Sequence, residues 1–325
     1  MQDNLRSEAA RLLESGEVAM VIAWEEGSDA ARTAPAFAVS AAEAAGLVWN
    51  PFCAANLVKY LLDYRYEDCR IAVAVKGCDE RAVNRLVHDR QLPRERIVVL
   101  GVPCGGMLDR EKAVAVLDPR ARLSSVEDRG KAFVLVSDQG EITLPKEEYL
   151  LEKCLSCARS APAQADIMLG PVVPAPARPG LDPFAAVREL EVLSPSEKSA
   201  YWDRQFSRCL RCYACRNVCP ACNCKECSFE QAVPGWQQGA SWISKNTSLA
   251  ENYTFHLIRM FDVAGRCIDC GECERVCPVK IPLSKLYRKV IKDAAELFAM
   301  PTPGLTPDEI PVLGSYSPED KEEFM

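Results

Sequence analysis

This sequence of 325 residues has little histidine, no long apolar run and no excess of positive charge. Only two histidines are present, His88 and His256, and neither has a cysteine or a second histidine at ligand spacing. We therefore expect both to be ordinary structural residues. Acidic residues outnumber basic ones by 46 to 39, and the net charge of -7 argues against a nucleic-acid partner, because phosphates attract a basic surface.

Patterns for membrane insertion and for nucleotide binding are absent too. No apolar run approaches the roughly 20 residues that a transmembrane helix needs. Met1 to Leu13 is a charged helical pattern without the apolar core of a secretion signal. Neither a G-x-G-x-x-G segment nor a P-loop occurs. The sequence thus predicts a cytoplasmic protein without a membrane span.

Cysteine, in contrast, is abundant, with 17 residues. Disulfides do not persist in a reducing compartment, so many cysteines in a cytoplasmic protein indicate metal binding or redox chemistry. A chain of this length is also long enough for two separate hydrophobic cores.

The first half alternates β-rich segments with helical patterns. The β-rich segments are Val18–Trp24, Arg70–Val75 and Arg96–Val102. Helical spacing of apolar residues is found in Cys53–Tyr64 and Asp79–Arg90. Such alternation predicts an α/β domain with a mostly parallel sheet. We expect residues 131–137 and 141–144 to form a hairpin that closes this sheet.

A proline-rich linker and a helical region follow. Five prolines lie between Pro171 and Pro183, a composition that excludes helix and inner strand. Ser194, Pro195 and Glu197 form the pattern of a capping box, and apolar residues from Leu283 to Leu297 follow one helical face. We expect an α/β domain over residues 1–170, a linker over 171–193, a mainly α-helical dicluster ferredoxin domain over 194–300 and an extended tail over 301–325.

The strongest motif is a repeated quartet of cysteines, C-x-x-C-x-x-C-x-x-x-C-P. Three closely spaced cysteines wrap one 4Fe-4S cubane, and the fourth ligand comes from the other quartet in ferredoxins with two clusters. The predicted ligands of the first cluster are Cys209, Cys212, Cys215 and Cys277, and those of the second are Cys267, Cys270, Cys273 and Cys219.

Structural zinc is the alternative, because C-x-x-C pairs also bind zinc tetrahedrally. Zinc sites use two such pairs, whereas this chain has two matching quartets that both end in Cys-Pro. We therefore favour clusters over zinc. With all four ligands supplied by cysteine, neither cluster has an open iron, so this half is expected to conduct electrons and not to catalyse.

Four further cysteines point to a third cluster in the first half. Cys78 and Cys104 each follow a predicted strand, and ligands gather beyond the carboxyl ends of parallel strands. The pair Cys154 and Cys157 would complete a cage of four sulfurs if its loop folded back onto the sheet edge. The alternative is that these are buried apolar cysteines.

A family resemblance supports the third cluster. The first half resembles the beta subunits of coenzyme F420-reducing hydrogenases and related dehydrogenases. The resemblance rests on the strand-Gly-Cys78 pattern, Gly-Val-Pro-Cys104, residues 142–145 (Ile-Thr-Leu-Pro), Cys154-x-x-Cys157 and residues 165–170. The resemblance covers roughly residues 17–170. It implies that Cys78, Cys104, Cys154 and Cys157 hold a 4Fe-4S cluster beside a flavin. Family members usually carry a glycine-rich, FAD-binding segment ahead of the first strand, which residues 1–16 do not match. The second half resembles the dicluster modules of heterodisulfide-reductase-like and anaerobic sulfite-reductase-like subunits.

Five cysteines remain. Cys222, Cys224 and Cys227 directly follow the first quartet, and Cys53 is expected at the start of a helix, where the helix dipole favours thiolate. We predict that these four could hold a fourth 4Fe-4S cluster or a zinc ion; the alternative is that the three loop cysteines surround the neighbouring cubane as weak donors. Cys69 is expected to be a plain buried thiol.

These patterns predict an iron-sulfur electron-transfer subunit of a cytoplasmic oxidoreductase complex in an anaerobe. The resemblance suggests formate dehydrogenase, hydrogenase or heterodisulfide-reductase-like partners, including electron-bifurcating ones. One rival prediction is a self-contained flavoenzyme that reduces a deazaflavin, NAD(P) or ferredoxin. The other is a zinc-stabilised docking scaffold.

Overall fold

A computed structural model describes residues 1–176, 180–225, 227, 229, 248–306 and 308–309. The chain divides into two compact units, Met1–Pro183 and Phe184–Met325. Their boundary falls within the segment 171–193 that was expected to be a linker. Residues 177–179 of that segment, and residues 307 and 310–325 of the expected tail, lie outside the described residues.

A six-stranded sheet forms the centre of the first unit. Its strand order is β2-β1-β4-β5-β9, with β3 paired to β1 as well. β1, β4, β5 and β9 run parallel, while β2 and β3 are antiparallel to β1. This confirms the predicted α/β fold with a mostly parallel sheet. The strands are β1 (Met20–Glu26), β2 (Thr33–Ala38), β3 (Leu47–Val48), β4 (Ile71–Lys76), β5 (Ile97–Val102) and β9 (Ile167–Met168).

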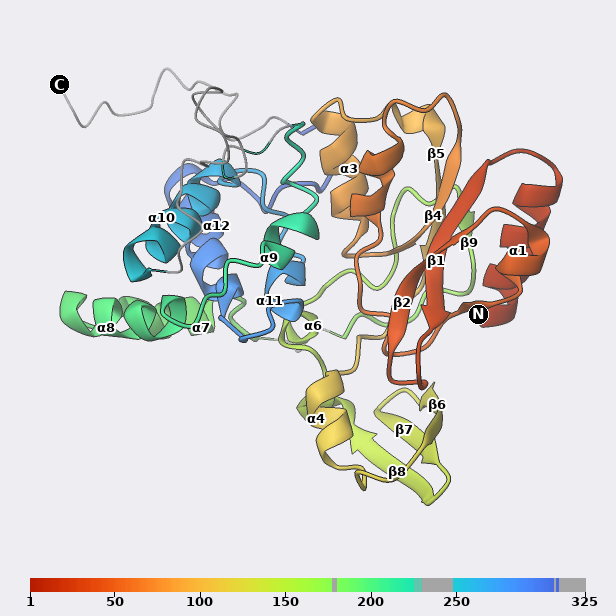
Figure 1. Cartoon of the computed structure of the whole chain (residues 1–325), viewed down its shortest axis with the longest axis horizontal. Coiled ribbons are helices and arrows are strands. Elements are labelled where there is room, and N and C mark those ends of the chain that lie inside the picture. Colours follow the sequence, from red (N-terminus) through yellow and green to blue (C-terminus); the bar gives the residue numbers. More distant parts are fainter. Residues whose placement is uncertain (177–179, 226, 228, 230–247, 307, 310–325) are drawn as a thin grey trace. The chain divides into compact units, whose positions relative to one another are not determined.

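The two central strands are covered on both faces. Every residue of β4 and of β5 is buried, as expected for parallel strands between helical layers. Helices α1 (Gln2–Glu14) and α3 (Glu80–His88) lie on opposite sides of the sheet (Figure 1). Short helical segments complete the unit: α2 (Ala41–Ala44), η1 (Val58–Tyr64), η2 (Arg94–Arg96), α4 (Arg110–Ala115), α5 (Lys146–Tyr149) and α6 (Glu152–Leu155).

The predicted hairpin forms, but it does not close the parallel sheet. Strands β7 (Ala132–Ser137) and β8 (Gly140–Pro145) pair with β6 (Leu123–Asp128) in a separate three-stranded sheet. Its apolar residues, among them Phe133 and Leu144, pack into a core of their own with the segment that follows β5. That separate core explains why the hairpin stands apart from the larger sheet in Figure 1.

The helix predicted over Cys53–Tyr64 is shorter than expected. Only Val58–Tyr64 is helical, as the 3-10 helix η1. Two asparagine side chains bond to nearby backbone instead: Asn50 Oδ1 accepts from Phe52 N–H at 2.8 Å, and Asn56 Oδ1 accepts from Val58 N–H at 3.0 Å. Such local bonds compete with helix formation.

A buried ion pair lies at the end of β4. Lys76 and Asp79 have no exposed side-chain surface and approach to 2.6 Å. The Lys76 ammonium also donates to the carbonyls of Cys53 and Ala55 and lies 4.6 Å from the centroid of the Trp24 ring. Although burial lowers it, the Asp79 carboxylate raises the pKa of Lys76 above its usual value, so the amine stays charged.

Replacing Asp79 with asparagine should therefore destabilise the chain strongly. The change leaves a buried cation without its counter-charge, a loss of about 3–5 kcal/mol. Urea unfolding of the full chain would measure it. Asp29→Asn is the matched control, because its pair with Arg32 is largely solvent-exposed and should cost roughly 0–1 kcal/mol. Equal costs for the two variants would contradict this account of the buried pair.

The described part of the second unit contains helices joined by loops and no strand. The capping box predicted at Ser194 is present and begins α8. The predicted apolar face of the last helix is confirmed at Leu283, Leu286 and Ile291, but Leu297 is 73% exposed because it lies in the final turn. The helices are α7 (Ala185–Glu191), α8 (Pro195–Phe206), α9 (Ala214–Asn217), α10 (Leu249–Asp262), α11 (Glu272–Arg275) and α12 (Leu283–Phe298). In the described part of the whole chain, no helix is both long and apolar enough to span a membrane.

Candidate metal centres

The two cysteine quartets of the second unit fold into matching loops. Arg211 and Tyr213 in the first loop have left-handed backbones, and so do Asp269 and Gly271 at the corresponding positions of the second. A short helix, α9 or α11, follows each loop. The turn directs an amide at sulfur, since Arg211 N–H lies 3.4 Å from Cys209 Sγ. The sequence repeat is therefore also a structural repeat.

The first predicted set of thiols comes together in the structure. Burial raises the pKa of Cys209, and the neighbouring Cys277 and Cys212 raise it further. Burial also raises the pKa of Cys215 to about 11, with contributions from the same three cysteines. Cys277 Sγ accepts a hydrogen bond from Ile281 N–H at 3.4 Å. Cys277, from the distant quartet, thus joins the first three cysteines.

The second predicted set lines a small cavity. Cys219, Cys267, Cys270 and Cys273 all face it. Burial raises the pKa of Cys267 to about 12, and proximity to Cys219 adds to this. The pKa of Cys273 is raised by burial and by its neighbours Cys270, Cys219 and Cys267. The crossed grouping expected from the sequence, with one cysteine of each quartet near the other three, is the grouping that the fold produces.

An ion pair ties each cysteine loop to a following helix. Arg211 pairs with Glu251 of α10 at 3.2 Å, and Asp269 pairs with Arg288 of α12 at 2.7 Å. The charges are reversed between the two loops, but the construction is the same. Both ties hold the loop backbone close to a packed helix.

Gly271→Val should damage the second loop. Its φ of +69° lies in the left-handed region, where a side chain costs about 1–2 kcal/mol and a β-branched one is especially strained. We expect lower stability in urea and loss of metal from the second set only. Gly271→Asn is the control, because asparagine tolerates this conformation. Full retention of stability and metal by the valine variant would show that the backbone turn is not required.

Strand pairing places two cysteines of the first unit side by side. Lys76 of β4 is in register with Val102 of β5, and Cys78 and Cys104 each follow two residues later. The loop after the third and fourth cysteines folds over these strand ends, where Cys104 N–H donates to Ser160 O at 2.6 Å. Gly77 packs against the same loop so closely that an added Cβ would lie 2.5 Å from Arg159 O.

The remaining two thiols of this set lie close to the first two. Burial raises the pKa of Cys104 to about 12, and Cys154 and Cys157 contribute. The pKa of Cys78 is raised by burial, by Asp79 and by Cys157. Cys154 Sγ accepts from Met107 N–H at 3.4 Å. The fold thus brings together the four cysteines that were predicted from the sequence to form the third set.

The chemistry of these three sets suits iron-sulfur clusters. Each offers four thiols, and backbone amides point at ligand sulfurs, as cluster loops require. Within the described ranges, no three His, Cys, Asp or Glu side chains are close enough to hold one metal ion. A cubane differs from a single ion in binding each thiolate to a separate iron.

The other predicted metal residues fall in different units. Cys53 belongs to the first unit, and Cys222, Cys224 and Cys227 belong to the second. No helix begins at Cys53, so the expected dipole effect is wrong, and burial raises the pKa of its thiol to about 11. Cys222 hydrogen-bonds to Cys219, which lowers the pKa of Cys219 and raises that of Cys222. A shared site of these four residues stays a prediction.

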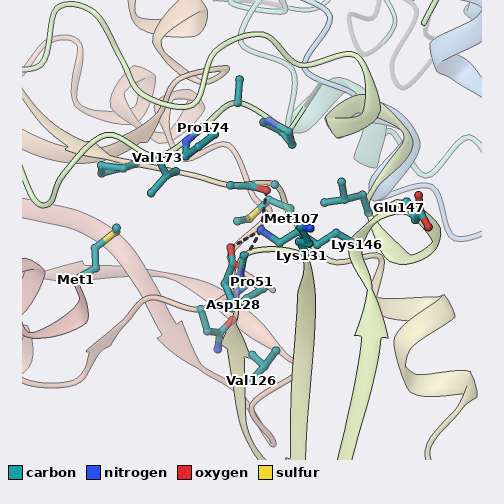
Figure 2. A pocket seen from close by; sticks show the side chains of 18 of the residues that line it. Met1, Pro51, Met107, Val126, Asp128, Lys131, Lys146, Glu147, Val173 and Pro174 are labelled. Carbon is teal, nitrogen blue, oxygen red and sulfur yellow. Dashed lines mark hydrogen bonds and ion pairs between the residues drawn. The ribbon is translucent and has the colours of Figure 1, made fainter. Parts of the chain in front are cut away.

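A pocket of about 940 Å³ adjoins the first unit's cysteines (Figure 2). Gly105, Gly106 and Met107, which follow Cys104, form part of its wall, and the small sheet forms another. Lys146 Nζ reaches across to Gly105 O at 3.1 Å and to Asp128 at 2.7 Å, as the dashed lines in Figure 2 show. An organic molecule in this pocket would lie near the Cys104 and Cys154 thiols.

Comparison with known proteins agrees with this geometry. Residues 68–188 match the family model for the C terminus of the coenzyme F420 hydrogenase/dehydrogenase beta subunit, and residues 205–281 match the model of a 4Fe-4S dicluster domain. The chain joins a coenzyme F420 hydrogenase/dehydrogenase beta-subunit-like domain to a 4Fe-4S dicluster domain. The resemblance inferred for the first half is therefore confirmed, and the second half is confirmed as a 4Fe-4S dicluster domain.

Two curated relatives match this beta-subunit-like chain over most of its length. It is 24% identical to the F420-dependent formate dehydrogenase subunit beta of Methanocaldococcus jannaschii, over 86% of each chain. It is 25% identical to the F420-dependent formate dehydrogenase 1 subunit beta of Methanococcus maripaludis, over 94% of this chain and 92% of the relative. Among solved structures, a chain of the F420-reducing NiFe hydrogenase complex from Methanosarcina barkeri matches with 16% identity and a TM-score of 0.40, covering 48% of this chain and 58% of that one.

Three polar residues beside the cysteines escaped the sequence reasoning. Lys76 lies next to the first unit's set, His256 lies 3.3 Å from Cys209 Sγ, and Arg259 donates to Cys215 O. The expectation that His256 is an ordinary structural residue did not include this contact with a predicted cluster ligand. A usable signal was present for α10, because Asn252, His256 and Arg259 follow helical spacing on a face that should be apolar.

Proposed function

We propose that this chain is the iron-sulfur electron-transfer subunit of an oxidoreductase complex, relaying single electrons between a catalytic subunit and an acceptor subunit. The observation that carries the proposal is the gathering of twelve cysteines into three sets of four. Relatives that match nearly the whole chain are named as beta subunits of F420-dependent formate dehydrogenases. A formate dehydrogenase, hydrogenase or heterodisulfide-reductase-like enzyme is the partner that we propose, in the cytoplasm of an anaerobe.

The cluster ligands follow from the three sets. Cys209, Cys212, Cys215 and Cys277 would hold one 4Fe-4S cluster, and Cys267, Cys270, Cys273 and Cys219 a second, both within residues 194–300. Cys78, Cys104, Cys154 and Cys157 would hold a third within residues 1–170. Segments 171–193 and 301–325 would act as linker and tail.

The clusters supply one-electron storage and transfer, and the protein's own residues make that possible. Burial of Cys104, Cys209 and Cys277 shields the sulfurs of these three residues from water, whereas Cys212 is exposed. Backbone amides of Gly106, Arg211 and Ile281 point at ligand sulfurs and stabilise negative charge there. Because each fourth ligand comes from the other loop, the paired sites lie next to one another, and an electron can pass between them.

Iron and acid-labile sulfide counted per chain after anaerobic purification would test this assignment. About twelve irons are expected for three clusters. Cys104→Ser should remove about four and leave the dicluster domain loaded, because it removes one ligand from the first unit only. Cys69→Ser is the control and should change nothing. Cys224→Ser should change the metal content only if the leftover cysteines hold a further cluster or zinc. A chain with zinc and no sulfide would refute the proposal and favour a zinc-stabilised scaffold.

A second candidate function is favoured by the pocket in Figure 2. An organic redox cofactor there, such as FAD, would lie beside the first unit's cysteines and could exchange electrons with a cluster. The chain would then be a flavoenzyme that itself reduces a deazaflavin, NAD(P) or ferredoxin. The contact of Met107 N–H with Cys154 Sγ links the pocket wall to the cysteine set.

This candidate predicts stoichiometric flavin in the purified chain, released by acid and detected by fluorescence, because a pocket of this size is in the usual range for cofactors. It also predicts acceptor reduction by the isolated chain. Gly106→Leu is a suitable probe, since Gly106 lies in the wall and has a φ of +109°. The variant should lose flavin and keep the iron of the dicluster domain. Absence of flavin from the unaltered chain would leave only the relay function.

A further inference from the structure

Helix α10 presents a buried polar stripe to the cysteine loops. Asn252, His256 and Arg259 recur at intervals of four and three residues, so they lie on one helical face. Each is at most 1% exposed. Burying polar groups is unfavourable unless specific partners compensate. We therefore expect these three polar side chains to make specific contacts that an apolar side chain could not make.

The first two members of the stripe contact the first cysteine loop. Asn252 Nδ2 donates to Phe206 O at 2.8 Å and to Cys209 O at 3.1 Å. His256 stacks on the Phe206 ring, with centroids 4.6 Å apart, and its Nε2 lies 3.3 Å from Cys209 Sγ. The tautomer with hydrogen on Nε2 can donate to the sulfur.

Arg259 lies between the two sets of thiols. Its Nη2 donates to Cys215 O, the carbonyl of a first-set cysteine, at 2.9 Å. Its side chain also lines the cavity that the four cysteines of the second set surround. Tyr287 of α12 holds the guanidinium from the other side, with its hydroxyl against Nη1 and its ring centroid 5.0 Å away. A permanent positive charge is thus fixed where it acts on both sets.

We propose that α10 tunes the reduction potentials of the paired clusters, with Arg259 raising both and His256 raising only the cluster that Cys209 binds. This inference deepens the proposed function and rests on it. A reduced cluster carries one more negative charge than an oxidised one, so a fixed cation or a hydrogen bond to sulfur stabilises the reduced form. Neither residue binds iron; both act through the surroundings of the ligands.

Redox titrations of the full chain, followed by electron paramagnetic resonance, would test the proposal. Arg259→Gln should shift the reduction equilibrium of both dicluster signals at least tenfold toward the oxidised form, a fall of about 59 mV or more for one electron. His256→Leu should lower one potential and leave the other unchanged. His256→Gln, which keeps a donor, should restore part of that shift. Arg204→Gln removes a charge from the exposed surface of α8 and should leave both potentials unchanged.

Iron is counted before each titration, so failure of the proposed function is recognised separately as a chain without clusters. Unchanged potentials in a fully loaded Arg259→Gln variant would overturn the proposal. If that variant does not load, Arg259→Lys decides, because it keeps the charge but not the planar fork. Reduction potentials within about 59 mV of those of the unaltered chain would support the charge effect. A larger fall would overturn it, because the planar shape of the guanidinium, and not its charge, would then be what the clusters require.

Discussion

The crossed grouping of cysteines in the second unit is the constraint on which the rest of that unit depends. Cys277 lies with the three cysteines of the first loop, and Cys219 lies with the three of the second. The two loops must therefore stay together for either set to be complete. The ion pairs of Arg211 with Glu251 and of Asp269 with Arg288 connect both loops to helices. Helices α10 and α12 can be understood as the frame that keeps the two loops in place.

Both units bury a cation beside their cysteines, but they stabilise it differently. Lys76 has a full counter-charge in Asp79 and two carbonyl partners. Arg259 is instead held by neutral groups, among them the Cys215 carbonyl and the Tyr287 hydroxyl. Several thiols surround the guanidinium, and thiolates would supply the missing negative charge. Thiolates bound to a cluster would thus stabilise the buried charge of Arg259, whereas the charge of Lys76 is already neutralised by Asp79 without a metal.

The sequence predicted those features that depend on local spacing or on strand order. Both quartets, the strands before Cys78 and Cys104, and the capping box at Ser194 could be identified because each signal lies within a few residues. The hairpin was recognised for the same reason, but its separation from the parallel sheet depends on packing with distant segments. The helix expected at Cys53 failed because Asn50 and Asn56 bond to nearby backbone. The helical spacing of Asn252, His256 and Arg259 is a local signal, but the contact between His256 and Cys209 spans 47 residues, so local spacing did not identify the partner.

The crossed grouping also sets an order for biogenesis. A ribosome releases the chain from its N-terminus, so Cys209, Cys212 and Cys215 emerge long before Cys277. The earlier loop must wait for the last cysteine of the later one before its set of four thiols is complete, and until then it exposes three thiols without the fourth. Cys78, Cys104, Cys154 and Cys157 have no such dependence, because all four belong to the unit that is synthesised first. The first set of thiols is thus complete only when nearly the whole chain has been made, whereas all four cysteines of the first unit are present before the second unit is synthesised.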